Sequence, residues 1–97
     1  MRFEIILAPE AVEDLKRLRA NARADIRTAL ETHLRHQPKK VSRSRIKRLC
    51  GLRQPQYRLR VGAIRIFYDV ADTTVQVLAI VTELEADSWL AQFANPE

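Results

Sequence analysis

The chain has 97 residues and a formal net charge of +5, and this length indicates one domain over residues 1–97. Hydrophobic residues make up 46% and charged residues 30% of the chain, which is the composition of a globular protein and excludes a disordered or collagen-like chain. Cys50 is the only cysteine, so an internal disulfide is excluded, and with two histidines besides we expect neither a metal site nor another cofactor. The longest apolar run, Val77–Val81, is far below the ~20 residues of a membrane-spanning helix, and the first residues lack a secretory signal pattern, so we expect a cytoplasmic protein.

The first third of the chain predicts a strand followed by two helices. Apolar side chains alternate over residues 2–7, as in a β-strand. Pro9 suits the first position of a helix, and Asn21 is the expected N-cap of a second helix that ends at Gln37-Pro38. The two helices would form a hairpin whose apolar stripes rest on a sheet. These stripes have helical spacing and consist of Ala11, Leu15 and Leu18, and of Ile26, Leu30 and Leu34.

The second half of the chain predicts three strands joined by tight turns. Residues 56–61 and 64–70 alternate between apolar and polar side chains, with a two-residue turn at 62–63 between them. A further turn is expected at 72–73, and residues 75–81 are apolar almost throughout, as in a central strand. Consecutive strands with such short connections form an antiparallel meander.

A short C-terminal helix is expected after the last strand. Thr82 and Glu85 have the spacing of a capping box, and Trp89, Leu90 and Phe93 would form the buried side of the helix. The order of elements therefore predicts an α+β fold. It consists of an N-terminal strand, a helical hairpin, a three-stranded antiparallel meander and a short C-terminal helix.

The charges are segregated along the chain. Residues 1–31 are neutral overall, residues 32–68 carry eleven Lys and Arg and no acid, and residues 69–97 carry six acids and no Lys or Arg. A basic stretch without internal counterions gains free energy from a polyanion, which is a nucleic acid or an acidic protein segment. The alternative is a solvated basic loop whose charge the acidic third of the chain offsets in the fold.

The turn at residues 62–63 also predicts a cluster of arginines. Counting from that turn, Arg60 lies opposite Arg65 and Arg58 opposite Phe67, on the face away from the helices. Like charges directly opposite one another destabilise a sheet, so such a pair favours a function such as bidentate binding of phosphate, and Phe67 could stack on a base. The alternative is that the arginines pair with acids of the chain itself. The candidates for such pairs are Asp69, Asp72, Glu83 and Glu85.

Groups able to move a proton are scarce near this face. His33 and His36 lie at the end of the second expected helix, where an ordinary helix-end role is the simpler interpretation. Tyr57 and Tyr68 fall on the core side of their strands by parity, and Cys50 has no histidine or acidic partner. The arginines can stabilise charge on a phosphate, but arginine is not a general base near neutral pH.

Three stretches carry a family resemblance. Residues 49–52 read Leu-Cys-Gly-Leu, residues 57–62 read Tyr-Arg-Leu-Arg-Val-Gly, and residues 64–69 read Ile-Arg-Ile-Phe-Tyr-Asp. This pattern resembles the RelE/ParE superfamily of bacterial toxins, over nearly the whole chain. The resemblance implies a RelE-like fold and the toxin half of a type II toxin–antitoxin pair. RelE-like members are ribosome-dependent endoribonucleases that cut mRNA, whereas ParE-like members inhibit DNA gyrase.

The resemblance also implies site residues and partners. Its nuclease branch holds mRNA phosphates with basic residues of the second and third strands. A basic residue and a tyrosine that the family carries after the last strand are missing from residues 82–89. The implied partners are mRNA on the ribosome and an acidic antitoxin. Two other functions stay open: the chain is a toxin that binds gyrase, or it is a non-toxic remnant that binds RNA or an antitoxin. The catalytic residues that the resemblance implies are Arg58, Arg60 and Arg65. The further residues that we expect to bind RNA are Arg45, Lys47, Arg48 and Phe67.

Overall fold

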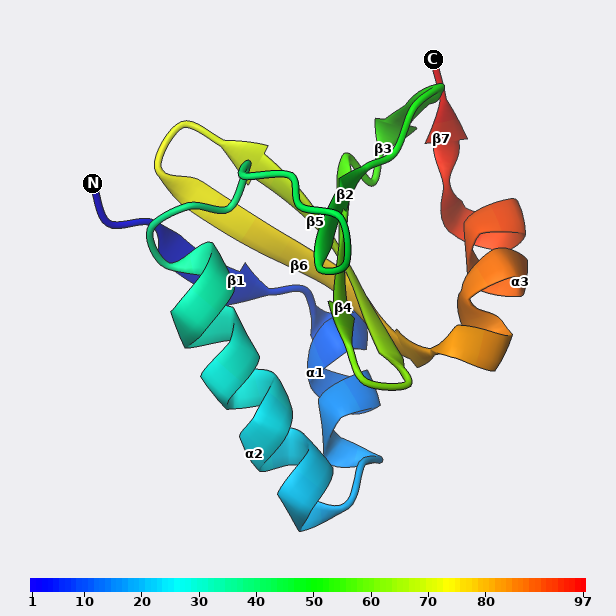
Figure 1. The fold of residues 1–97 in the computed structure, drawn as a ribbon. Helices are drawn as coiled ribbons and strands as arrows, with labels where there is room; N and C mark the ends of the chain where they lie inside the picture. Colours follow the sequence, from blue (N-terminus) through cyan, green and yellow to red (C-terminus); the bar gives the residue numbers. More distant parts are fainter.

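The computed structural model describes all 97 residues, and its elements form the expected α+β fold (Figure 1). The strands make a five-stranded sheet in the order β1-β6-β5-β4-β2 and a separate two-stranded sheet of β3 and β7. None of the helices is long and apolar enough to cross a membrane. The elements in chain order are β1 (Glu4–Leu7), α1 (Pro9–Lys16), α2 (Ala20–Ala29), the π-helix η1 (Leu30–Leu34), β2 (Ile46–Arg48), β3 (Leu52–Gln54), β4 (Tyr57–Val61), β5 (Ile64–Ala71), β6 (Thr74–Thr82), α3 (Glu83–Phe93) and β7 (Asn95–Pro96).

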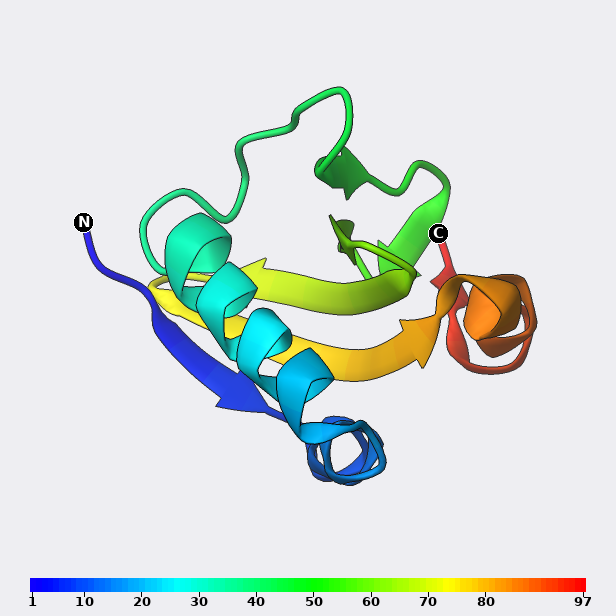
Figure 2. The same ribbon diagram turned by 60° about the horizontal axis from the view of Figure 1, so that its bottom comes forward.

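The N-terminal strand forms one edge of the five-stranded sheet, and the helical hairpin that follows it packs against the sheet. β1 runs parallel to β6, whereas every other pair of neighbours in this sheet is antiparallel. A parallel neighbour needs a long connection, and part of it is formed by α1 and α2. Figure 2 shows α2 lying along one face of the sheet, with α1 below it and α3 at the far end of β6.

The prediction that Asn21 caps the second helix is wrong. α2 begins at Ala20, and the preceding residue, Arg19, is its N-cap in an extended conformation without a side-chain hydrogen bond. The Asn21 Oδ1 accepts a 2.9 Å hydrogen bond from the backbone N–H of Ala22 inside the helix. α1 ends at Lys16, so the link between the helices is short and the second helix starts before Asn21 is reached.

The antiparallel meander of β4, β5 and β6 is confirmed. The register of β4 and β5 follows from the turn at residues 62–63, and it places Arg60 opposite Arg65 and Arg58 opposite Phe67. Gly62 has a φ of +57°, a left-handed conformation that glycine adopts at little cost, so the two-residue turn closes the hairpin without strain.

Three short strands were not predicted from the sequence. β2 pairs with the outer edge of β4, with Ile46 opposite Leu59 and Lys47 opposite Arg58. β3 and β7 pair with each other and hold the C-terminus beside residues 52–54. Each of these strands has only two or three residues, too few to show an alternating pattern, and their pairing depends on neighbours in space.

The core lies between the helical hairpin and the sheet. Ile26 of α2 packs with Leu59, Ile66 and Tyr68 of β4 and β5, and all four are almost fully buried. Burying such side chains contributes about 1.5–3 kcal/mol each to folding. Tyr68 belongs to the buried core, Tyr57 packs against it, and their rings stack at a centroid distance of 5.4 Å, so the prediction that both tyrosines lie on the core side is confirmed.

Tyr68 also fixes the loop that follows η1. Its hydroxyl donates a 2.7 Å hydrogen bond to the backbone carbonyl of Pro38, which is itself buried. We expect Tyr68→Phe to lower the free energy of unfolding by about 1–3 kcal/mol, because a buried carbonyl loses its donor. Urea denaturation at neutral pH measures this effect, and an unchanged midpoint would contradict it.

The same residue predicts a loss of stability in alkali. Burial raises the pKa of the Tyr68 phenol well above its usual value, and the nearby Tyr57 contributes in the same direction. Because the pKa is higher in the folded than in the unfolded chain, the stability contributed by the protonated Tyr68 phenol is complete below about pH 10, the usual pKa of tyrosine. This stability declines at higher pH. Denaturation of Tyr68→Phe should therefore depend less on pH in this alkaline range than that of the unchanged protein.

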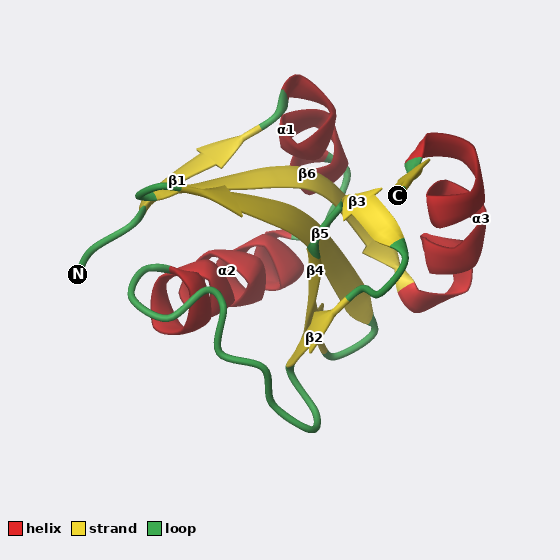
Figure 3. Ribbon diagram, turned by 90° about the horizontal axis from the view of Figure 1, so that it is seen from above, coloured by secondary structure: helices red, strands yellow, loops and turns green.

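The C-terminal helix is anchored at its start and along one side only. The capping box is present: the Thr82 hydroxyl accepts from the backbone N–H of Glu85, and the Glu85 carboxylate accepts from that of Thr82. This hydrogen bonding lowers the pKa of Glu85. The expected buried side is not formed: α3 has no fully buried residue, Trp89 is half-buried, and Phe93 is 55% exposed. The helix lies at one end of β5 and β6 (Figure 3), so only part of its surface has a partner.

Candidate nucleic-acid interface

Four basic residues come together on the side of the sheet that faces away from α1 and α2. Lys47 of β2 lies opposite Arg58 of β4, and Arg60 of β4 lies opposite Arg65 of β5. Directly opposed residues of antiparallel strands point to the same face, and residues two apart along a strand do so as well. Lys47, Arg58, Arg60 and Arg65 therefore share one surface, which we call the basic face.

Arg58 lies at the centre of the basic face and lacks a counterion. It is half-buried, and its Nε is buried without any hydrogen-bond partner. The pKa of this guanidinium is lowered by burial and then by the positive charges of Arg65 and Arg60. A buried donor without an acceptor is unfavourable, and an anion bound at the guanidinium would offset the repulsion between Arg58 and the two neighbouring arginines.

Arg60 and Lys47 leave the basic face open to a ligand. Both are exposed, and neither forms an ion pair or a side-chain hydrogen bond within the chain. The backbone N–H of Arg60 donates 2.9 Å to the carbonyl of Arg45, which fixes the start of β2 beside this strand. These two side chains are thus held on rigid strands with their charged groups in solvent.

Arg65 is held by the chain itself. The residue is only 9% exposed, and its Nη1 donates to the carbonyls of Gly62 and Ile64 at 2.8 and 3.1 Å. Its Nη2 lies 3.3 Å from a carboxylate oxygen of Glu83 at the start of α3. Arg65 therefore pairs with an acid of the chain itself, as in the alternative interpretation of the arginine cluster. Its hydrogen bonds to Gly62 and Ile64 hold the turn of the β4–β5 hairpin.

Phe67 does not offer its ring to a base. It is 1% exposed, and the Trp89 ring of α3 stacks on it at a centroid distance of 5.0 Å and an interplanar angle of 6°. The expectation of an open aromatic surface beside the arginines is wrong, because α3 covers this end of the sheet. The strand pattern predicted the correct face for Phe67, but it could not show that a later helix covers it.

Arg48 and Arg45 do not join the basic face. Arg48 pairs with Tyr57, so it points to the opposite side, where its guanidinium lies 5.3 Å from the centroid of the Tyr57 ring and donates to the carbonyl of Gln56. Arg45 precedes β2, and its charge contributes to lowering the pKa of His33 at the end of the helical hairpin. The basic residues around β2 therefore lie on both sides of the sheet.

Few groups near the basic face can accept a proton. Tyr57 and Tyr68 lie on the core side, and Asp69 accepts hydrogen bonds from Gln54 and the backbone of Gln56. The Glu83 carboxylate beside Arg65 is the only acid paired with an arginine of the basic face. The arrangement can bind phosphate and stabilise charge on it, and it contains no preformed pair of acid and base.

The comparisons with known proteins identify the family. A family model described as "ParE toxin of type II toxin-antitoxin system, parDE" matches residues 5–86, which is most of the chain. The chain belongs to this toxin family. The resemblance to the RelE/ParE superfamily is thereby confirmed. The motifs at residues 57–62 and 64–69 lie in the matched region, where they form β4, its turn and most of β5. No curated protein matches it by sequence.

Solved toxin structures share the fold. The E. coli toxin RelE, solved in the free state as a mutant, superposes with a TM-score of 0.69 at 17% identity, covering 92% of each chain. The RelB–RelE complex of Methanococcus jannaschii contains a chain with a TM-score of 0.66 and 24% identity, covering 87% of the toxin and 96% of that chain. The RelBE2 complex of Mycobacterium tuberculosis gives a TM-score of 0.63 at 22% identity, covering 84% and 99%. These likenesses confirm a RelE-like fold.

Proposed function

We propose that this toxin arrests growth by cutting mRNA on the ribosome, with Lys47, Arg58 and Arg60 holding the RNA backbone. The observation that carries the proposal is Arg58, a half-buried guanidinium that has no acceptor for its Nε and is crowded by two other arginines. Phosphate oxygens are the ligand that such a cluster fits best, because guanidinium groups bind them bidentately. The RelE-like fold supports RNA as the source of the phosphate.

The chemistry assigned to the basic face is stabilisation of charge. When the 2′-oxygen attacks the neighbouring phosphorus, the bond from that phosphorus to the 5′-oxygen of the next nucleotide breaks. The products are a 2′,3′-cyclic phosphate and a 5′-hydroxyl, and the proton lost by the 2′-hydroxyl is balanced by the one that the 5′-oxygen gains. Negative charge builds on the non-bridging oxygens during this exchange, and fixed cations lower the energy of that state. Arg58 and Arg60 project from one strand and would act together, while Arg65 supports the hairpin that positions them. No metal is required for this role.

Expression with transcript mapping tests the proposal. Induction of the toxin alone should stop growth, and new 5′ ends should appear inside the coding regions of translated messages. Purified toxin should cut mRNA in the presence of ribosomes in vitro. Growth arrest with intact transcripts would overturn the nuclease proposal, and normal growth after strong induction would favour a non-toxic remnant.

A second candidate function is inhibition of DNA gyrase. The family model matched by the toxin is that of ParE, and the basic residue and tyrosine of the nuclease branch are absent from residues 82–89, which form the cap and first turns of α3. This candidate predicts that purified toxin blocks supercoiling of relaxed plasmid by gyrase. Unchanged supercoiling at saturating toxin would eliminate it.

We propose an acidic antitoxin as the protein partner. Residues 32–68 carry eleven basic residues and no acid, so a disordered acidic segment could fold onto them and cover Arg58 and Arg60. Solved relatives of the same fold are toxin–antitoxin complexes, which supports this kind of partner. Co-expression of an acidic protein encoded next to the toxin should restore growth, and failure of every neighbouring gene to do so would contradict the proposal.

A further inference from the structure

A second basic site lies on the other side of β2, at the end of the helical hairpin. A cavity of about 270 Å³ opens there, and its lining includes His33, His36, Lys40 and Arg45. The hydroxyl-bearing residues Thr32 and Ser42 complete its polar wall, and no acidic residue lines it. The basic face does not include any of these side chains, and the proposed cleavage does not use them.

Hydrogen bonds hold the loop that builds this cavity. At its start, the buried Pro38 carbonyl accepts from the Tyr68 hydroxyl at 2.7 Å. At its end, the Ser42 Oγ accepts from the backbone N–H groups of Arg45 and Ile46 at 3.1 and 3.2 Å, and the Ser42 N–H donates to the Ile46 carbonyl. The cationic side chains therefore extend from a loop that is anchored at both ends.

The electrostatics of the cavity favour an anion. Burial and then the charge of Arg45 lower the pKa of His33, so this imidazole stays neutral near neutral pH and can donate a hydrogen bond without needing a counterion. Helix-end carbonyls would repel an anion, but two of them are already occupied: the Arg35 carbonyl accepts from Phe3 and the Gln37 carbonyl from Lys40. The fixed charges left at the cavity are the cations Lys40 and Arg45.

We propose that this cavity binds a phosphate group of a nucleic-acid backbone, as a second contact beyond the basic face. β2 is the edge strand between the two sites, with Lys47 directed to the basic face and Arg45 at the cavity, so one nucleic-acid strand passing over this edge reaches both. The choice of nucleic acid rests on the proposed function, whereas the preference of the cavity for phosphate does not.

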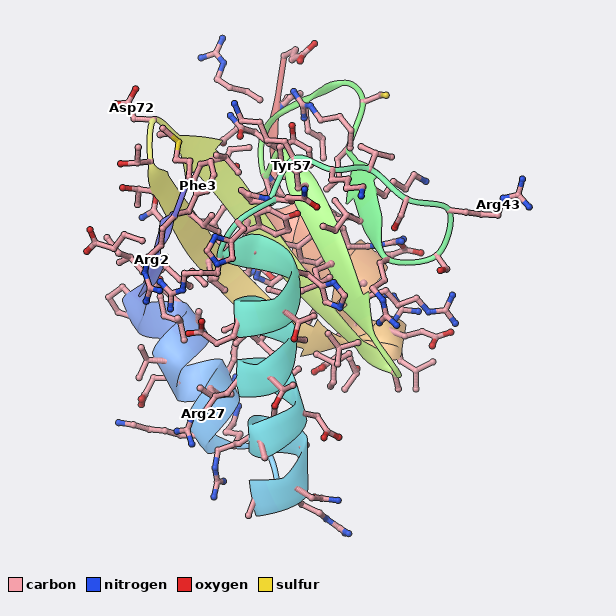
Figure 4. All side chains as sticks on the ribbon, turned by 60° about the vertical axis from the view of Figure 1, so that its left-hand side comes forward. Arg2, Phe3, Arg27, Arg43, Tyr57 and Asp72 are labelled. Carbon is pink, nitrogen blue, oxygen red and sulfur yellow. The ribbon has the colours of Figure 1, made fainter.

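Matched double variants test the proposal. Lys40→Ala with Arg45→Ala removes two cations that line the cavity, and Lys39→Ala with Arg43→Ala removes two exposed cations of the same loop that do not line it. Figure 4 shows Arg43 pointing away from the body of the molecule. Both doubles change the net charge equally, so general attraction to a polyanion falls equally in both.

The first measurement is binding of a fluorescent 2′-O-methyl RNA oligonucleotide, which lacks the hydroxyl needed for cleavage. We expect the cavity double variant to bind about tenfold more weakly and to reduce the slope of log affinity against log salt by about 0.7, the value for one phosphate contact on a single strand. The control double variant should lose less than about threefold. Equal losses in both would overturn the proposal, because they would indicate diffuse charge.

The second measurement uses inorganic phosphate and does not depend on toxicity. Titration with phosphate should shift the imidazole NMR signals of His33 in the unchanged toxin and in the control double variant, and should leave them in place in the cavity double variant. Absence of any shift in the unchanged toxin would overturn the site. A shift with phosphate in a toxin that leaves transcripts intact would refute the proposed function alone. The same variants can be tested with an acidic peptide. If the cavity double variant binds this peptide more weakly but binds RNA as well as the control double variant does, the cavity serves a protein partner and the proposal is overturned.

Discussion

Arg60→Ala should abolish growth arrest while leaving the toxin folded. Arg60 is exposed on the outward side of β4 and makes no ion pair, so its removal takes no packing from the core. If Arg60 stabilises the charge that develops on the scissile phosphate, its loss should lower the cleavage rate by about 10²–10³. Cutting of a defined message by purified toxin and ribosomes measures this rate.

Two control variants define what the loss means. Arg60→Lys retains the charge but not the bidentate geometry, and we expect it to recover only part of the activity. Arg53→Ala removes an exposed arginine of β3, outside the basic face, and should leave cleavage and growth arrest nearly unchanged. If Arg53→Ala and Arg60→Ala are equally inactive, total charge and not the basic face is responsible.

Phe67→Ala should destabilise the fold by about 3–5 kcal/mol, which is a large part of the stability of a domain this small. The ring is buried between the sheet and Trp89, so truncation leaves a cavity and removes the partner on which α3 stacks. Thermal or urea denaturation measures the change. A melting curve like that of the unchanged toxin would show that the ring does not support α3.

Phe67→Leu separates a packing role from base stacking. Leucine keeps most of the apolar volume, so we expect a cost of about 1–2 kcal/mol and a folded protein. Affinity for the 2′-O-methyl RNA should stay within about threefold of the unchanged toxin, because a ring covered by Trp89 cannot reach a base. A folded Phe67→Leu with more than a tenfold loss of RNA affinity would instead require α3 to move away on binding.

Local pattern was sufficient for the elements whose information lies within a few residues. The turn at Gly62 sets the register of β4 and β5, and a register follows from counting once the turn is known, so the Arg60–Arg65 pair was predictable. The capping box of Thr82 and Glu85 was predictable for the same reason, because both partners belong to one helical turn. The motifs that carried the family resemblance lie in these same segments.

Contacts between distant segments could not be read in this way. Three strands, β2, β3 and β7, were missed because each has too few residues to show alternation. The pairing of β3 with β7 also joins segments that lie far apart along the chain. The pairing of Arg65 with Glu83 was one of several open alternatives, and only the position of α3 selects it. The cavity at His33 and Arg45 likewise joins a helix end to a loop that carries no recognisable motif.

The amino-acid sequence alone thus determined the family, the central hairpin and the side of the sheet on which its arginines point, since each follows from a turn, an alternation or a motif. The tertiary structure decided which of those side chains can meet a ligand. α3 folds back over one end of the sheet, buries Phe67 and pairs with Arg65, while β2 adds Lys47 beside Arg58. The physical reason is that exposure and pairing depend on which distant surface covers a residue, and local periodicity carries no information about that surface.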